Sequence, residues 1–204
     1  MAPSNCTELT GDDRRALLRI ARLALEDAVL GRPGAAAVTE LTPGLSSHRG
    51  AFVTLTRNGR LRGCIGALEP REALARTVAA AARDAALADP RFPGIRSEEL
   101  ASVHIEISVL SPLEELAADS RQTLERALVP GRDGLSISEG EREATFLPKV
   151  WEQLPQASEF VARLLEKAGL PADHWSGPLR CRTYTGESIA ECSPAPGEPA
   201  HPAG

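Results

Sequence analysis

The stretch AFVTLTRNGRLRGCIGAL, residues 51–68, decides the fold of this chain. Two runs of β-branched and apolar residues flank Asn58-Gly59, the dipeptide that most strongly predicts a two-residue hairpin with a type I′ turn. Because side chains alternate along a strand, a turn at these two residues sets the register. The expected cross-strand pairs are Arg57 with Arg60, Leu55 with Arg62, Thr54 with Gly63, Val53 with Cys64, and Phe52 with Ile65.

The second strand of this hairpin carries an unusual sequence, LRGCIG at residues 61–66. In the expected register Arg62 and Cys64 share one face of the strand, whereas Leu61 and Ile65 share the other. A charged side chain and a thiol therefore lie side by side on a strand that glycines weaken. This arrangement makes LRGCIG the first place to look for a site.

Periodic patterns continue on both sides of the hairpin. The expected helices are residues 12–30, 70–88, 120–128 and 157–168, and the expected strands are residues 103–109, 134–138, 143–148 and 179–185. These elements do not alternate regularly between strand and helix. The order therefore indicates an α+β fold with a mostly antiparallel sheet and flanking helices.

Composition restricts the classes of protein to consider. A chain of 204 residues that is 42% hydrophobic can bury one substantial core. Its net charge of -5 argues against general nucleic-acid binding, which usually requires a basic surface. No apolar run is long enough to span a membrane, and the polar N-terminal stretch does not resemble a signal peptide. We therefore expect a cytoplasmic protein.

The four cysteines show no metal-binding or redox spacing. They stand at positions 6, 64, 181 and 192, without a CxxC motif. Two close cysteines on each side of a longer segment are typical of structural zinc, and that pattern is absent from the sequence. We expect free thiols and no metal site.

Six short motifs, taken in order, resemble the AMMECR domain family, specifically the branch called AmmeMemoRadiSam system protein A. The motifs are GAFVTL (50–55), LRGCIG (61–66), DPRF (89–92), IEISVLSP (105–112), FLPKV (146–150) and EKAGL (166–170). The resemblance covers roughly residues 15–186. We accordingly place the domain at residues 11–190, between a flexible tail at 1–10 and a disordered Pro/Gly/Ala-rich tail at 191–204.

This resemblance implies a single α+β domain, divided into two unequal subdomains, with LRGCIG facing the cleft between them. It also implies companions, because such proteins look like partners of a Memo-like protein and a radical SAM protein. The resemblance supplies no demonstrated activity and no cofactor. Whether the chain is an enzyme is left open.

Cys64 allows two interpretations. A guanidinium at Arg62 would lower the pKa of the thiol, which suits a nucleophilic or redox-sensitive cysteine. Alternatively, Cys64 is a small buried hydrophobe, and Gly63 and Gly66 only make room for the alanine-rich helix. Glycines at these positions would equally let a ligand approach the strand.

Arg62 is the candidate for binding an anion. Its expected neighbours are apolar, so its guanidinium needs either an acidic partner or an anionic ligand. The expected acidic partner is Glu106 on the strand at 103–109. A structural pair and a ligand-binding arginine both satisfy the rule that buried charges are paired.

His104, Glu106 and Ser108 form a polar row on one face of that strand. A histidine and a carboxylate within reach of Cys64 would supply a base and the group that orients it. The alternative is the ordinary polar face of a half-exposed antiparallel strand. DPRF, by contrast, is predicted to stop a helix, with Asp89 capping it or pairing with Arg91.

Three functions remain as hypotheses. The first is an accessory component that binds a partner or an anionic small ligand through the LRGCIG cleft. The second is an enzyme with Cys64 as nucleophile or redox centre and Glu106 and His104 as supporting groups. The third is RNA or nucleotide handling through the hairpin arginines, which the low aromatic content of 3% disfavours.

Overall fold

A computed structural model describes residues 8–33 and 41–191. The chain divides into two compact units. The larger one, called here the hairpin unit, comprises the described residues 8–33, 41–109 and 188–191. The smaller one, called the aromatic unit, comprises residues 110–187. Most of the two tails expected from the sequence lies outside the described residues.

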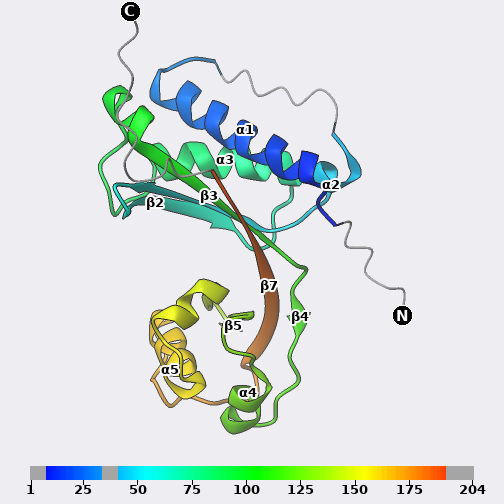
Figure 1. The fold of residues 1–204 in the computed structure, drawn as a ribbon. Helices are drawn as coiled ribbons and strands as arrows, with labels where there is room; N and C mark the ends of the chain where they lie inside the picture. Colours follow the sequence, from blue (N-terminus) through cyan, green and yellow to red (C-terminus); the bar gives the residue numbers. More distant parts are fainter. Residues whose placement is uncertain (1–7, 34–40, 192–204) are drawn as a thin grey trace, which may run out of the picture. The chain divides into compact units, whose positions relative to one another are not determined.

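The hairpin unit packs helices against one side of an antiparallel sheet (Figure 1). Its elements are α1 (Gly11–Val29), α2 (Pro43–Ser46), β1 (Ala51–Arg57), β2 (Arg60–Ala67), α3 (Leu74–Leu87), the 3-10 helix η1 (Ser97–Ser102) and β3 (Val103–Leu110). The strand order is β2-β1-β3, and β7 follows β3. Strand β2 is therefore the edge of this sheet.

The expected hairpin is confirmed at its tip. Asn58 and Gly59 have positive φ angles of 51° and 73°, as a type I′ turn requires. The observed pairs are Arg57 with Arg60, Thr56 with Leu61, Leu55 with Gly63, Thr54 with Cys64, and Val53 with Ile65. The register therefore matches the expectation only as far as Leu61.

A β-bulge at Arg62 makes the rest of the expected register wrong. Arg62 is the extra residue, because Thr56 faces Leu61 while the preceding residue of β1 already faces Gly63. From this point on, every residue of β2 pairs one position away from its expected partner. Leu61 and Ile65, expected on one face, consequently lie on opposite faces of the sheet.

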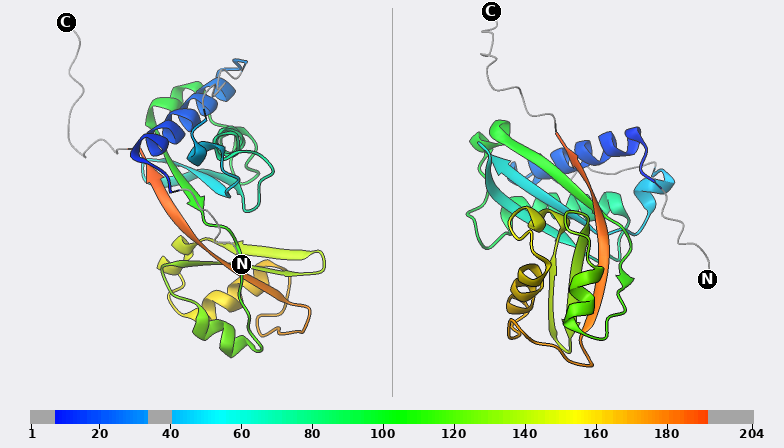
Figure 2. Two further views of the ribbon diagram at one scale, coloured as in Figure 1. Left: turned by 90° about the vertical axis from the view of Figure 1, so that its right-hand side faces the viewer. Right: turned by 60° about the horizontal axis from the view of Figure 1, so that its bottom comes forward.

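The core of the hairpin unit lies between its helices and the inner face of its sheet. Alternate residues of β1 and β3, such as Val53 and Ile107, are fully buried there. Helix α1 begins with a capping box, in which Thr10 accepts the N–H of Asp13 and the Asp13 carboxylate accepts the N–H of Thr10. Figure 2 shows α1 and α3 lying together over this sheet.

The aromatic unit has its own core, and its strands continue the strand order from β7 to β5 and β6. Its elements are β4 (Glu114–Glu115), α4 (Arg121–Ala127), β5 (Asp133–Glu139), β6 (Arg142–Phe146), the 3-10 helix η2 (Pro148–Glu152), α5 (Ala157–Lys167) and β7 (Arg180–Ala190). Strand β5 lies between β6 and β7, and β4 pairs with β7. Trp151 stacks on Phe160 with ring centroids 3.9 Å apart.

The largest differences from the expected element boundaries are at α3 and β7. Helix α3 begins at Leu74 rather than at residue 70. Strand β7 continues to Ala190, beyond the expected end at residue 185, because its last residues, 188–190, belong to the hairpin unit. The α+β class and the antiparallel pairing are confirmed. No helix in the described part of the chain is long and apolar enough to cross a membrane.

Candidate functional site

The outer edge of β2 is covered by the DPRF segment that follows α3. The Asp89 carboxylate accepts the Cys64 N–H at 2.8 Å, and the Arg91 guanidinium donates to the Cys64 carbonyl at 3.2 Å. Arg91 also donates to both oxygens of Asp89, at 2.9 and 2.7 Å. These side chains replace the neighbouring strand that an edge residue lacks. The expected pairing of Asp89 with Arg91 is confirmed.

Burial and charge fix Asp89 in its ionised form. Its side chain is 1% exposed, and its four accepted hydrogen bonds come from Cys64 and Arg91. The hydrogen bond from Arg91 holds the pKa of the Asp89 carboxyl well below its usual range. The same bond raises the pKa of the Arg91 guanidinium, and the nearby Cys64 sulfur acts in the same direction.

The Cys64 thiol is free and half-buried. The Thr54 hydroxyl donates to its Sγ at 3.4 Å from the opposing strand. Cys64 is thus not sealed in the core, which was one alternative left by the sequence. The cation that the structure places beside Cys64 is Arg91, whose side chain is 54% exposed. The sequence had suggested Arg62 for this position.

Arg62 is paired with an acid other than the one expected from the sequence. Its Nε and Nη2 donate to the two oxygens of Glu99, each at 3.1 Å. The same guanidinium donates to the carbonyls of Pro93 and Gly94 at 2.6 and 3.1 Å. The expectation of an Arg62–Glu106 pair is therefore wrong. The bulge directs the Arg62 side chain toward the segment after α3. Arg62 therefore forms a structural ion pair with Glu99 instead of the expected pair with Glu106.

Glu99 holds several arginines at once. Its side chain is 6% exposed, and it also accepts from Arg57 Nη1 at 3.0 Å and from the backbone N–H of Arg96 at 3.0 Å. The hydrogen bond from Arg62 lowers the pKa of the Glu99 carboxyl to about 2. One buried carboxylate thus anchors two of the three hairpin arginines.

Gly63 and Gly66 each serve close packing. A Cβ at Gly63 would lie 2.1 Å from the carbonyl oxygen of Ala85, so the backbones of β2 and α3 touch here. A Cβ at Gly66 would lie 2.2 Å from the carbonyl oxygen of Ala51 and 2.6 Å from the ring of Phe52. For Gly63 this supports the interpretation that it accommodates the alanine-rich helix.

The candidate catalytic residues lie on the same face of the sheet. Cys64 pairs with Thr54, which in turn pairs with Glu106, so the three residues form one row across β2, β1 and β3. Ser188 of β7 donates to Glu106 at 2.9 Å. His104 lies two residues before Glu106 and is half-buried on the same face. The structure therefore brings a thiol and a carboxylate into one row, with a hydroxyl between them.

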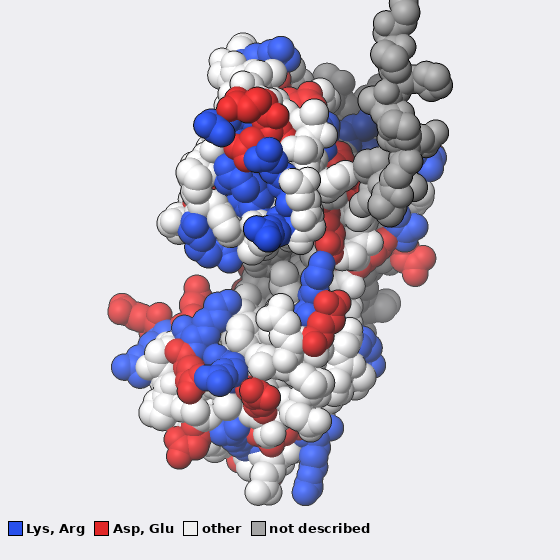
Figure 3. Space-filling view, turned by 60° about the vertical axis from the view of Figure 1, so that its left-hand side comes forward, with Lys and Arg blue, Asp and Glu red and all other residues white. Residues whose placement is uncertain are grey.

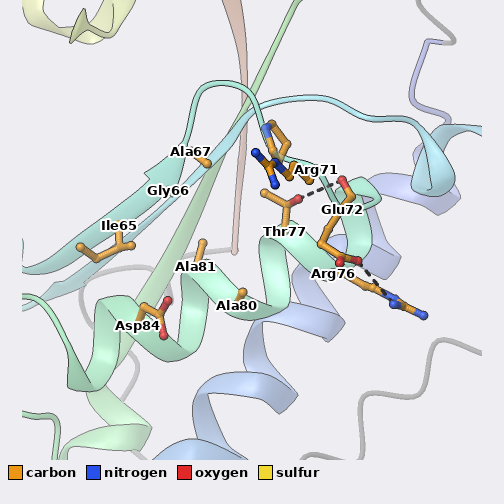
Figure 4. Close-up of a pocket in the computed structure, with 11 residues that line it drawn as sticks. Ile65, Gly66, Ala67, Arg71, Glu72, Arg76, Thr77, Ala80, Ala81 and Asp84 are labelled. Atoms are coloured by element: carbon orange, nitrogen blue, oxygen red, sulfur yellow. Dashed lines mark hydrogen bonds and ion pairs between the residues drawn. The ribbon is translucent and has the colours of Figure 1, made fainter. Parts of the chain in front are cut away.

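A small pocket of about 210 Å³ lies between β2 and α3, within the hairpin unit (Figure 4). The last half of LRGCIG forms one wall, and small side chains of α3 form the other. Arg71, Glu72, Arg76 and Asp84 contribute charged groups of both signs to its surroundings. The apolar and backbone lining comes from Ile65, Gly66, Ala67, Ala80 and Ala81.

Two of the three hairpin arginines, Arg57 and Arg62, contact an acidic side chain, that of Glu99. Arg57, Arg60 and Arg62 line a depression at the tip of the hairpin. On the face drawn in Figure 3, basic and acidic side chains are interspersed.

Within residues 8–33 and 41–191, no three His, Cys, Asp or Glu side chains are grouped to hold a metal ion.

Sequence reasoning missed the residues that frame Cys64. Thr54 could not be recognised because the expected register placed it opposite Gly63. Asp89 and Arg91 were interpreted as a helix stop and a possible pair, without a contact to Cys64, although DPRF was one of the motifs that carried the family resemblance. Glu99 lies in a short 3-10 helix, η1, which no periodic pattern in the sequence predicts.

Comparisons with known proteins agree with this architecture. The family model described as AMMECR1 matches residues 18–189. A protein of Methanothermobacter thermautotrophicus is 38% identical over 83% of this chain and 89% of its own length. A protein of Methanosarcina acetivorans is 34% identical over 91% of this chain and 95% of its own length. The crystal structure of the uncharacterised protein PH0010 from Pyrococcus horikoshii superposes with a TM-score of 0.78 at 34% identity, covering 84% of this chain and 88% of that one.

Proposed function

The chain belongs to the AMMECR1 family, and from that premise we propose that it is an accessory, binding component acting with a Memo-like protein and a radical SAM protein. The resemblance of its motifs to the AmmeMemoRadiSam branch motivates these two partners. The recognition element is the second half of the LRGCIG strand, together with the pocket beside it. The proposal concerns association and assigns no reaction to this chain.

One observation supports a binding role above the others. The pocket of about 210 Å³ adjoins Ile65 and Gly66, where the LRGCIG strand lies at the edge of the sheet. By contrast, the Arg62 guanidinium is used by Glu99 and two backbone carbonyls. The motif therefore offers a surface for recognition, and its most obvious anion-binding group is already engaged.

Co-purification tests this proposal directly. The full chain should be co-expressed with the Memo-like and radical SAM proteins encoded in the same genome, with a tag on one component at a time. We expect a complex that survives size-exclusion chromatography. A variant that fills the pocket, Ala80→Leu, should weaken it. Elution of all three proteins as separate species, at every salt concentration and redox condition tried, would refute the accessory role.

A second function, an enzyme using Cys64, is favoured by the surroundings of its sulfur. The thiol is half-buried, receives a hydrogen bond from Thr54, and lies near the Arg91 guanidinium. A thiolate next to a cation can act as a nucleophile. In the enzyme hypothesis, Glu106 supplies a further polar group in the same row as Cys64. His104 lies two residues before Glu106 on β3.

Alkylation kinetics discriminate this second function. Peptide mapping should follow iodoacetamide labelling of Cys64 against pH, with Cys181 as the internal reference. Cys181 is buried, and burial raises the pKa of its thiol to about 11. The enzyme hypothesis requires Cys64 to react faster than Cys181 and to slow down in an Arg91→Ala variant. Equal, slow labelling of both cysteines would remove it.

A further inference from the structure

The exposed edge of β2 has one segment that DPRF does not cover. In an antiparallel pair, residues alternate between exchanging hydrogen bonds with the partner strand and pointing their N–H and C=O groups away from it. The Cys64 N–H goes outward to Asp89, so the Thr54–Cys64 pair is of the outward type. Two residues on, the Phe52–Gly66 pair must be of the same type. Gly66 therefore directs one donor and one acceptor away from β1.

These two backbone groups open onto the pocket. Gly66 lines it, and no described strand pairs with β2 on that side. An unpaired donor and acceptor at a sheet edge form a template for another extended chain. Beside a pocket, the same edge can bind main chain through hydrogen bonds and receive one side chain in the hollow. The floor of this hollow is apolar and small, formed by Ile65, Ala80 and Ala81.

The pocket carries a cation at one end and an anion at the other. In Figure 4, Arg71 lies near Thr77, at the start of α3, and Asp84 lies toward the far end of that helix. The helix rises by about 10 Å between Thr77 and Asp84. An extended peptide covers this distance with about three residues.

Of the two arginines that line the pocket, Arg71 is the one available to bind an anionic group of a ligand. Arg76 pairs with Glu72 at 3.4 Å, and Figure 4 shows its guanidinium directed away from the pocket. Arg71, in contrast, forms no ion pair within the described part of the chain and is exposed. Asp84 is 48% exposed, and its contact to Arg83 is long, at 3.8 Å. A ligand with a carboxylate at one end and a positive charge about three residues away would complement both groups.

We infer that the β2 edge and its pocket bind the carboxyl-terminal end of a partner protein. Its last three or so residues add to β2 as a short strand and hydrogen-bond to Gly66. The terminal carboxylate pairs with Arg71, a small apolar side chain enters the pocket over Ala80, and a basic residue upstream faces Asp84. This inference rests on the proposed accessory function and specifies how the partner is recognised.

A peptide array tests the inference with the full-length chain. Peptides with randomised last four residues are presented with a free carboxylate, and the same peptides are presented as carboxamides. We expect binding only to the free-acid set, with small apolar residues selected near the end and Lys or Arg selected upstream. Amidation should weaken a selected peptide at least about tenfold, because it removes a charge-assisted contact.

Matched variants locate the site. Arg71→Ala should reproduce the tenfold loss for free-acid peptides, and Asp84→Asn should abolish the preference for an upstream basic residue. Arg76→Ala is the control for Arg71→Ala, because Arg76 lies close to Arg71 in the sequence, in the first turn of α3, but pairs with Glu72. All three positions lie at the surface, so the thermal midpoint should stay unchanged. Equal binding of acid and amide peptides, or wild-type affinity in Arg71→Ala, would overturn the inference.

The failure of the tail-recognition inference can be distinguished from the failure of the accessory role. If the Memo-like and radical SAM proteins associate with this chain, and removing their last four residues or introducing Arg71→Ala changes nothing, the tail-recognition inference fails while the accessory role stands. If neither protein associates but the array selects free-acid peptides through Arg71, the accessory role with these partners fails while the tail-binding site stands.

Discussion

Glu99 is the buried acid that neutralises two hairpin arginines, Arg57 and Arg62. Its 6% exposed carboxylate accepts from Arg62, whose side chain is only 14% exposed, and from Arg57. Replacing Glu99 by alanine would leave a mostly buried guanidinium without its acid. We expect Glu99→Ala to lower the free energy of unfolding by about 3 kcal/mol in urea titrations. Glu98→Ala, at a 62% exposed position, is the matched control and should cost less than about 0.5 kcal/mol.

Lowering the pH should remove the contribution of Glu99 to the free energy of unfolding within a defined pH window. Its pKa falls from 4.5 to about 2 in the folded chain, because Arg62 stabilises the charged form. A lowered folded pKa gives stability that is fully present above about 4.5 and is lost as the pH falls toward about 2. The depression corresponds to about 3 kcal/mol. The stability difference between wild type and Glu99→Gln should therefore shrink across this window, and a constant difference would contradict the assignment.

Gly63 offers the sharpest steric test. A methyl group there would lie 2.1 Å from the Ala85 carbonyl oxygen, and neither backbone can move without displacing an element. We expect Gly63→Ala to cost about 3 kcal/mol or more, or to prevent folding. Gly177→Ala is the control, since nothing lies within 4 Å of its Cβ position. Thermal melts of the two variants side by side make the comparison.

At the scale of elements, the covering of the β2 edge gives a further prediction. The buried Asp89 carboxylate accepts the Cys64 N–H, which would otherwise face solvent. Asp89→Asn should cost about 2 kcal/mol and should speed hydrogen exchange at the Cys64 amide. The half-exposed Asp84 of α3 supplies the control variant, Asp84→Asn. Unchanged exchange at Cys64 in Asp89→Asn would show that the cap does not protect this edge.

The hairpin shows where sequence reasoning succeeds and where it stops. Asn58-Gly59 specified the turn, because few other residues adopt two consecutive positive φ angles. The bulge at Arg62 could not be predicted, because the acid that holds this side chain comes from η1, more than 30 residues further along the chain. A long-range contact thus overrode a pattern that local rules described well.

The same limit explains the mixed result for the site. Cys64, Glu106 and His104 do lie on one face of the sheet, which alternation alone suggests once the strands are paired. Register decides which of them are neighbours, and the register moved by one residue at the bulge. Thr54 consequently contacts the sulfur, and the nearby guanidinium comes from Arg91. Side chains from a loop beyond α3 cannot be assigned to a strand edge without the fold.

At the scale of the whole molecule, the described residues 8–33 and 41–191 form two hydrophobic cores with no residue in common. Both tryptophans of the chain, Trp151 and Trp175, pack in the aromatic unit, while the long helices α1 and α3 belong to the hairpin unit. Tryptophan fluorescence therefore follows one unit, and far-UV circular dichroism mainly follows the other. Compact units with separate cores can unfold separately.

Phe160→Ala tests this independence. The substitution removes the ring stacked on Trp151 and should cost the aromatic unit about 4 kcal/mol. We expect the fluorescence midpoint in urea to fall well below the circular-dichroism midpoint. Leu17→Ala, in the core of the hairpin unit, should have the opposite effect on the two midpoints. If both probes shift together in both variants, the chain unfolds as one cooperative body.

Strand β7 has a consequence for how the chain is made. It is the last described element, and it belongs to both units, with residues 180–187 in the aromatic unit and 188–190 in the hairpin unit. During synthesis, every other strand of the described chain therefore emerges from the ribosome before this one. Strands β3 and β5 each lack one neighbouring strand until β7 has been synthesised, and during that interval the nascent chain most needs protection by chaperones.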